Sequence, residues 1–175
     1  MQKVLVGMSG GIDSSVAACL LKEQGYEVLG VHLRFWSEPG SENKIHRIEN
    51  KCCSIESWEL AAEVAKKIGI QFKVIDLAEE FKEKIVDYYL EESSRCITPN
   101  PCVECNRYIK FGKFLEATKD LNADFIATGH YIKKHTIVNP DGSETYKLYE
   151  AEDHQKDQSY FLYTLTQEKL KKVLF

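Results

Sequence analysis

The stretch VLVGMSGGIDS, residues Val4–Ser14, decides the fold of this chain. Its apolar first part, Val4 to Met8, is typical of a buried parallel strand. Directly after the stretch, apolar residues recur at the spacing of a helix that packs on one face, at Val16, Leu20 and Leu21, with Ala17 among them. The segment between the two patterns is therefore predicted to be a strand-to-helix turn.

The composition of this turn is suited to binding phosphate. Gly10 and Gly11 allow the backbone to approach a ligand closely, because neither carries a Cβ atom. Ser9 and Ser14 add hydroxyl donors, and the N–H groups at the start of a helix attract an anion. The turn matches neither the Walker pattern nor the dinucleotide glycine pattern. We predict a phosphate-binding loop; an ordinary βα turn capped by Asp13 is the alternative.

Asp13 also indicates a cation. We expect its carboxylate to be buried beside the bound phosphates. Two negative groups in one place need Mg²⁺ or a lysine between them.

The rest of the chain alternates strand patterns with helix patterns. The predicted strands are 28–33, 70–76 and 123–128, and the predicted helices are 58–68, 81–89 and 106–121. Strands separated by helices indicate βαβ units, and so an α/β fold with an open, doubly wound parallel sheet and helices on both faces. Residues 131–150 break the pattern and predict a β-hairpin that turns at Asn139–Gly142.

Local signals predict further details. Ser54 or Ser57 is expected to cap the helix over 58–68, and Thr166 is expected to cap a final helix. Residues 39–50 are polar and contain both glycine and proline, which is typical of a mobile loop. Residues 171–175 end on apolar side chains, which we interpret as a chain cut within a longer protein.

Composition narrows the class of protein. A chain of 175 residues with 43% hydrophobic residues predicts one globular domain over 1–175. Its apolar runs are too short to span a membrane and no leader pattern is present, so we expect a soluble, cytoplasmic protein without a membrane partner. The net charge of −4 argues against nucleic acid as a partner of the whole surface, although residues 95–113 form a locally basic segment.

The segment TPNPCVECN, residues 98–106, is a second chemical centre. Two prolines stiffen it, and Asn106 is expected to cap the helix that follows. Cys105 is then placed just before a helix N-terminus, where the helix dipole and Arg107 lower its pKa and favour a nucleophilic thiolate. A structural zinc site fits less well, because no second cysteine pair matches, and a redox pair fits less well, because the segment follows proline-rich coil and not a βα turn. An iron–sulfur cluster bound by Cys102 and Cys105 remains open.

The loop and the cysteine segment together resemble a known family. The loop after the first strand resembles that of the PP-loop ATP pyrophosphatases. The cysteine segment, continued by Ile109-Lys110-Phe111, resembles the tRNA-specific 2-thiouridylases. Three more stretches agree in the same order along the chain: Cys52-Cys53-Ser54, Thr128-Gly129-His130-Tyr131 and Lys156-Asp157-Gln158-Ser159-Tyr160-Phe161-Leu162.

This resemblance implies an adenine nucleotide alpha-hydrolase-like fold and a set of site residues. ATP, with Mg²⁺, is expected to contact residues of the loop and of two strand ends: Gly7, Met8, Ser9, Gly10, Gly11, Ile12, Asp13, Ser14, Leu33 and Gly129. Cys105 matches the catalytic nucleophile, with Cys102 beside it. The target base and the tRNA are expected to contact Asn100, Pro101, Cys102, His130, Lys156, Asp157 and Gln158.

The implied reaction is 2-thiolation of the wobble uridine of tRNA. ATP adenylates the C2 oxygen of the uracil, and a persulfide sulfur, supplied by a donor protein, then displaces AMP. The family uses a further cysteine and additional tRNA-binding domains, so the resemblance covers about the N-terminal half of a member. A nucleotide-binding fragment without catalysis, or another PP-loop ligase or sulfurtransferase, is the alternative.

Two matched stretches also have purely structural interpretations. His130 ends a predicted strand, so it is either a site residue or a hydrogen-bonded core histidine. Residues 160–162 are interpreted as core packing rather than as a surface for stacking bases.

Overall fold

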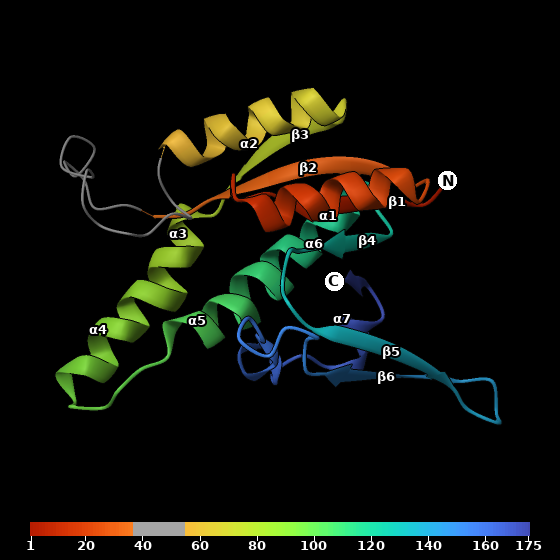
Figure 1. Ribbon diagram of the computed structural model, residues 1–175. Helices are drawn as coiled ribbons and strands as arrows, with labels where there is room; N and C mark the ends of the chain where they lie inside the picture. Colours follow the sequence, from red (N-terminus) through yellow and green to blue (C-terminus); the bar gives the residue numbers. More distant parts are fainter. Residues whose placement is uncertain (37–54) are drawn as a thin grey trace.

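The computed structural model describes residues 1–36 and 55–175, so Cys52, Cys53, Ser54 and the polar segment 39–50 lie outside the described part. Strands and helices alternate along the chain (Figure 1). The strands are β1 (Lys3–Gly7), β2 (Glu27–Arg34), β3 (Gln71–Asp76), β4 (Phe125–Ala127), β5 (Lys133–Val138), β6 (Glu144–Tyr149) and β7 (Val173–Leu174). The helices and turns are α1 (Ile12–Glu23), α2 (Ile55–Ile68), α3 (Ala78–Phe81), η1 (Lys82–Val86), α4 (Asp87–Ser94), α5 (Pro101–Glu104), η2 (Cys105–Lys113), α6 (Phe114–Asp120), η3 (Ser159–Leu162) and α7 (Gln167–Leu170).

The main sheet confirms the predicted fold class. Its strand order is β3-β2-β1-β4-β7, and every neighbouring pair is parallel. The order runs outward in both directions from β1, which is the signature of a doubly wound sheet. The predicted hairpin is also present, as the antiparallel pair β5–β6, which projects away from the sheet in Figure 1.

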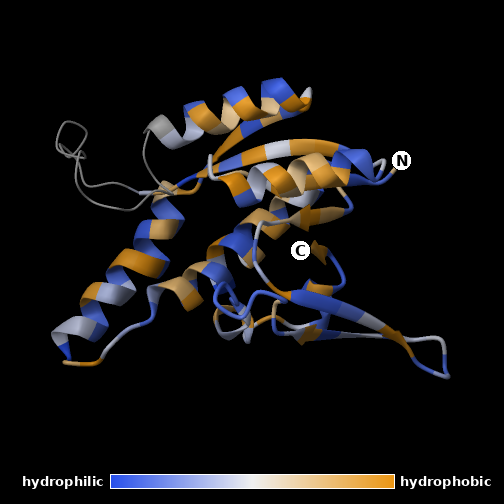
Figure 2. Cartoon of the chain, viewed as in Figure 1, coloured by the Kyte–Doolittle hydropathy of each residue, from blue (hydrophilic) through white to orange (hydrophobic). Residues whose placement is uncertain are grey.

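The two faces of the sheet each bury their own core, because side chains alternate along a strand. Val4 and Val6 point toward α1 and α2, whereas Leu5 points toward the helix formed by η2 and α6. Phe111 and Phe114 fill that second core and are fully buried. Figure 2 shows the central strands as largely apolar and much of β5 in the hairpin as hydrophilic. Helices therefore cover both faces, as predicted.

The buried face of α1 differs from the predicted one. The sequence pattern placed Val16 and Leu20 inward, but their side chains are 48% and 49% exposed. Leu21 is buried as predicted, and its buried neighbours on the helix are Ala18 and Ser14. The small side chain of Ala18 packs in the same core cluster as Val4 and Val6 of the sheet. The helix is therefore rotated so that Val16 and Leu20 face outward.

The helix that carries the cysteines begins earlier than predicted. Asn100, not Asn106, is its N-cap: the Asn100 side chain accepts a hydrogen bond from the Val103 backbone N–H at 3.2 Å. Pro101 occupies the first helical position, which suits a residue without an N–H group. Asn106 is buried inside the helix and donates from Nδ2 to the Phe161 carbonyl at 3.1 Å.

Several other predictions can be compared with the structure. Ser57 lies within α2 rather than at its cap, because the helix begins at Ile55. Thr166 caps α7 as predicted, accepting a bond from the Lys169 N–H at 3.4 Å. The apolar residues that follow α7 form β7, an additional strand paired with β4 that the sequence pattern did not predict.

The phosphate-loop turn is pressed against α2. Gly10 has a positive φ of 79°, and a Cβ atom built there would lie 2.6 Å from the Ser57 carbonyl oxygen. Gly25 also has a positive φ, of 86°, but has no heavy atom within 4 Å of a Cβ. Glycine is therefore needed at both positions for conformation, and at Gly10 for space as well.

We predict that Gly10→Ala lowers the free energy of unfolding clearly more than Gly25→Ala, the matched control. Gly25→Ala carries only the left-handed strain, about 1–2 kcal/mol, whereas Gly10→Ala must also displace the α2 backbone. Urea unfolding followed by circular dichroism measures both values. Equal losses for the two variants would contradict the contact between this loop and α2.

Candidate functional site

A pocket opens at the carboxyl ends of the central strands, where ligands bind in sheets of this type. Its volume is about 290 Å³. It brings together the phosphate-loop turn, the end of β2, the end of β4 and one helix from the opposite face. Its lining consists of Gly7, Met8, Ser9, Asp13, Ser14, Val31, His32, Leu33, Phe35, Lys110, Phe114, Thr128, Gly129, His130 and Gln158.

This pocket unites most of the nucleotide residues predicted from the sequence. Gly7, Met8, Ser9, Asp13, Ser14, Leu33 and Gly129 all line it. Gly10, Gly11 and Ile12 belong to the same turn but are not in the lining, and the Ile12 side chain is 80% exposed. The loop therefore faces the pocket through its two ends.

Hydroxyl groups organise the turn from within. The Ser14 hydroxyl donates to the Gly11 carbonyl at 3.1 Å and accepts from the Ser9 N–H at 3.3 Å. The Ser9 hydroxyl accepts from the Gly11 N–H at 3.4 Å. Ser14 is buried, so its hydroxyl shapes the loop as well as facing the pocket.

Asp13 is exposed, which corrects the expectation that its carboxylate is buried. Its Oδ1 accepts a hydrogen bond from the Tyr131 hydroxyl at 2.9 Å. The Nζ of Lys156 lies 3.4 Å from the same hydroxyl and 4.8 Å from the centre of the Tyr131 ring. The hydrogen bond to Tyr131, with the nearby charge of Asp13, raises the pKa of Lys156, so the ammonium stays charged. A lysine therefore lies next to this carboxylate.

Gly129 holds the end of β4 against the start of α1. A Cβ atom at Gly129 would lie 2.8 Å from both the Asp13 carbonyl carbon and the Ser14 backbone nitrogen. No side chain fits at that distance, so only glycine permits this approach. The close contact fixes the width of the pocket beside the phosphate loop.

Two histidines that face the pocket are neutral near pH 7. Burial lowers the pKa of His32, whose Nδ1 lies 2.9 Å from the Met8 carbonyl. Burial and the charge of Lys110 lower the pKa of His130 to about 3. His130 Nδ1 also lies 2.8 Å from the Thr128 hydroxyl oxygen. His130 is thus both hydrogen-bonded in the structure and part of the pocket lining.

Six of the lining residues were not predicted as site residues from the sequence: Val31, His32, Phe35, Lys110, Phe114 and Thr128. His32 is a titratable residue inside an otherwise apolar strand, a signal that could have marked it. Lys110 belongs to a matched motif, but only the packing of η2 against the sheet brings it to the pocket.

The cysteine pair lies on the helix that reaches the pocket through Lys110. Cys102 is exposed, and Cys105 is partly buried against the core on that face of the sheet. The predicted place of Cys105 ahead of a helix is wrong, because the helix already begins at Pro101, with Asn100 as its N-cap. Cys102 lies in the first turn, and the dipole effect has weakened by Cys105. The residues are three apart, so both lie on one side of the helix.

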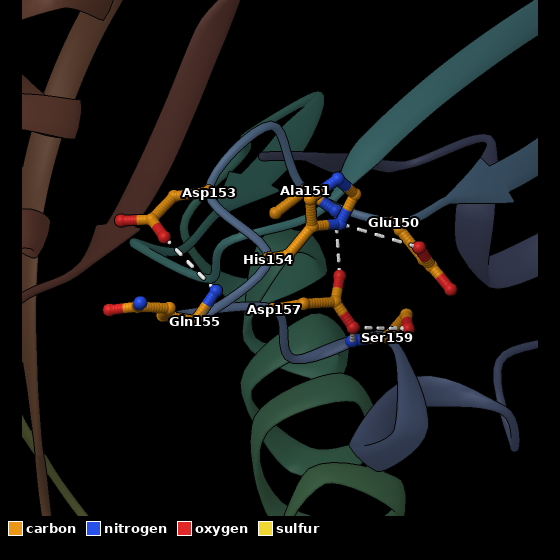
Figure 3. A network of polar contacts seen from close by, with 7 residues as sticks. All are labelled: Glu150, Ala151, Asp153, His154, Gln155, Asp157 and Ser159. Atoms are coloured by element: carbon orange, nitrogen blue, oxygen red, sulfur yellow. Dashed lines mark hydrogen bonds and ion pairs between the residues drawn. The ribbon is translucent and has the colours of Figure 1, made fainter.

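The segment 156–158 splits into different environments. Gln158 lines the pocket and is paired with Tyr131, since its Oε1 accepts from the Tyr131 N–H and its own N–H donates to the Tyr131 carbonyl, both at 3.0 Å. Asp157 instead organises its own loop (Figure 3) by accepting from the Ala151 N–H at 2.6 Å and the Ser159 hydroxyl at 2.6 Å. The hydrogen bond with the Ser159 hydroxyl has the larger effect and the bond with the Ala151 N–H the smaller, and both lower the pKa of Asp157.

Most of the residues predicted to act in catalysis or to contact tRNA do not line the pocket: Asn100, Pro101, Cys102, Cys105, Lys156 and Asp157. Within residues 1–36 and 55–175, no group of three or more histidine, cysteine, aspartate or glutamate side chains is placed to hold a metal ion. The same residues contain no helix that is both long and apolar enough to cross a membrane.

Comparison with known proteins agrees with the resemblance seen in the sequence. The chain is 46% identical over 99% of its length to a tRNA-specific 2-thiouridylase MnmA of Clostridioides difficile, and covers 46% of that relative. It is 49% identical over its whole length to the MnmA of Christiangramia forsetii, and covers 43% of it. The chain thus spans just under half the length of these relatives.

Two solved structures are similar to part of the chain. A predicted subunit of tRNA methyltransferase from Methanocaldococcus jannaschii is 28% identical, with a TM-score of 0.49 over 73% of this chain and 53% of that one. A glutamine-dependent NAD+ synthetase from Acinetobacter baumannii, in complex with ADP, is 18% identical, with a TM-score of 0.49 over 72% of this chain and 21% of that one.

A family model covers almost the entire chain. The model described as the tRNA methyl transferase HUP domain matches residues 2–175, a span that contains the phosphate loop, the cysteine helix and the β5–β6 hairpin. The chain belongs to the tRNA methyl transferase HUP domain family.

Proposed function

We propose that this chain is the ATP-binding and uridine-activating part of a tRNA-specific 2-thiouridylase. The observation that carries the proposal is the pocket, in which the phosphate-loop turn faces Leu33 and Gly129 at the carboxyl ends of parallel strands. The relatives from Clostridioides difficile and Christiangramia forsetii are tRNA-specific 2-thiouridylases, which supports the choice of reaction.

ATP fits this pocket with its phosphates at the helix start. The N–H groups and hydroxyls of the Ser9–Ser14 turn bind the phosphates, and the dipole of α1 favours their charge. Leu33 and Phe35 offer apolar surface to the adenine. Gly129 closes the other side.

Mg²⁺ belongs to this proposal as the partner of the triphosphate. Asp13 is an accessible carboxylate in the pocket lining, and one carboxylate with phosphate oxygens is a common ligand set for Mg²⁺. When bound there, the ion would be held by Asp13 and would supply positive charge to the triphosphate. Lys156, next to Asp13 through Tyr131, supplies further positive charge from the protein itself.

The target of the activated phosphate is the C2 oxygen of the wobble uridine. An oxygen on a pyrimidine ring is a poor leaving group, and adenylation makes it a good one. The base must leave its stack to reach a pocket of this kind. In this scheme the target base contacts Asn100, Pro101 and Cys102. Other parts of the tRNA contact His130, Lys156, Asp157 and Gln158. His130 acts as a neutral hydrogen-bonding group, because burial keeps its pKa about 3.

Sulfur then replaces AMP at C2. A donor protein supplies the sulfur as a persulfide on the further cysteine that the family uses, and the outer sulfur of that persulfide attacks C2 and displaces AMP. The Cys105 thiolate then attacks the inner sulfur, so the C2 sulfur leaves as 2-thiouridine and Cys105 forms a disulfide with the further cysteine. A thiol reductant reopens that disulfide. The competing arrangement is a [4Fe–4S] cluster held by Cys102 and Cys105. Among the described residues, no third histidine, cysteine, aspartate or glutamate side chain is placed with these two cysteines to complete a metal site. Iron and acid-labile sulfide measured in anaerobically purified protein separate the two.

A second candidate function is nucleotide binding without catalysis, and another PP-loop ligase is a third. Both keep the phosphate loop, and neither needs a tRNA-dependent reaction. The distinguishing property is therefore whether substrate tRNA triggers cleavage of ATP.

We predict that the protein releases pyrophosphate from ATP and Mg²⁺ only when substrate tRNA is added, and that Cys105→Ser retains this release, because the cysteine acts after adenylation. A coupled pyrophosphate assay measures both. Release independent of tRNA, or inorganic phosphate as the product, would contradict the proposal.

We predict that Asp13→Ala weakens ATP–Mg²⁺ binding about tenfold, the value of one charged contact. Asp13 is exposed and makes one hydrogen bond, to Tyr131, so the melting temperature should stay nearly unchanged. Asp120→Ala, an exposed aspartate on α6, is the matched control. Calorimetric titration gives both affinities, and equal affinities would overturn the assignment of Asp13.

We predict that the protein loses stability as the pH falls from about 6.5 toward 3. The pKa of His130 is lowered on folding, so the unfolded chain binds a proton in this range that the folded chain does not. His130→Gln should reduce the fall in melting temperature between pH 7 and pH 4, whereas His154→Gln, at an exposed site, should not. An identical pH profile for His130→Gln would show that the imidazole is not held neutral.

A further inference from the structure

Two tyrosines, one within and one directly after the matched stretch 156–162, are exposed at the η3 turn. Tyr160 is 66% exposed and Tyr163 is 69% exposed, whereas Leu162 between them is fully buried. The centres of the two tyrosine rings are 6.3 Å apart, with the ring planes tilted by 51°. The interpretation of residues 160–162 as core packing is therefore correct for Leu162 and wrong for Tyr160.

The backbone that presents these rings is firmly held. The Asp157 carboxylate accepts from the Ser159 N–H at 3.1 Å and from its hydroxyl at 2.6 Å, as Figure 3 shows for this loop. The Phe161 carbonyl accepts from Asn106 Nδ2 at 3.1 Å. Two aromatic side chains on an anchored turn lose little conformational freedom when a ligand covers them.

The pair also lies beside the proposed reaction site. Asn106, which binds the turn, directly follows Cys105 in the chain, and η3 packs against both α5 and η2. Gln158, at the start of the turn, lines the nucleotide pocket. The α5–η2 segment carries Arg107, Lys110 and Lys113 against a single acid, Glu104, so its charge suits a polyanion.

We propose that the exposed rings of Tyr160 and Tyr163 form a platform on which unpaired bases of the substrate tRNA stack. This inference rests on the proposed function. Sequence-specific enzymes for RNA commonly stack splayed bases on aromatic side chains, because every base has a flat face. A platform next to the cysteine helix supports the bases that flank the target uridine once that uridine has left its stack. In this arrangement the tRNA phosphates contact Arg107, Lys110 and Lys113.

The test is tRNA binding by the whole chain, measured at low ionic strength and across a salt series with substrate tRNA as the probe. We expect Tyr160→Ala and Tyr163→Ala each to weaken binding about tenfold. The slope of log affinity against log salt should stay unchanged, because stacking releases no counterions. Tyr160→Phe should bind as the unmodified protein does. Tyr89→Ala, at a tyrosine 47% exposed on α4, should have no effect.

Each outcome is decisive. Alanine variants that bind tRNA normally, while tRNA still triggers pyrophosphate release, overturn the platform and leave the proposed function standing. A shallower salt slope in these variants also overturns it, because that result means a phosphate contact. Normal ATP affinity and melting temperature in both variants exclude misfolding. An unmodified protein that binds no tRNA at low ionic strength overturns the platform, whereas one that binds tRNA but shows no tRNA-dependent pyrophosphate release refutes the proposed function itself.

Discussion

The phosphate-loop turn is held between two backbones, and the geometry of the site depends on that constraint. On one side Gly10 faces the Ser57 carbonyl of α2, and on the other Gly129 faces the backbone between Asp13 and Ser14. At both contacts a Cβ atom would come within 3 Å of backbone atoms. The position of the loop therefore depends on glycine at both contacts, because any side chain there would clash with backbone. The hydroxyl and N–H groups of the loop can then point toward a ligand.

This constraint links the fold to the chemistry. A doubly wound parallel sheet brings the ends of β1, β2 and β4 to one edge, so the loop, Leu33 and Gly129 meet although they are far apart in the sequence. The second layer of helices adds Lys110 from the opposite face. The segment after the hairpin adds Gln158 and, through Tyr131, the charge of Lys156. A nucleotide bound in the pocket would therefore contact the phosphate loop, the ends of β2 and β4, the η2 helix and the segment after the hairpin.

Much of the fold could be predicted because its signals are local. Apolar runs and helical spacing identified most of the main-sheet strands, and the Asn139–Gly142 turn identified the hairpin. The misses have physical reasons. β7 is too short to show a period, and it exists because it pairs with β4. The cysteine helix had two asparagines available as caps, and Pro101 after Asn100 was the signal that favoured the earlier one. The exposure of Asp13, Val16 and Tyr160 depends on tertiary packing, which no local pattern contains. The same holds for Lys110, which packing brings to the pocket, whereas His32 carried a local signal as the one titratable residue inside an apolar strand pattern.

The central claim is that ATP binds with its phosphates on the Ser9–Ser14 turn and its adenine against Leu33. A crystal structure of the protein with Mg²⁺ and α,β-methylene ATP, which resists cleavage at the proposed bond, tests it most directly. The account predicts phosphate oxygens within hydrogen-bonding distance of the turn's N–H groups, and the adenine between Leu33 and Gly129. Nucleotide bound elsewhere, for example in the groove lined by Lys113, Lys119 and Lys172, with the turn unoccupied, would contradict it.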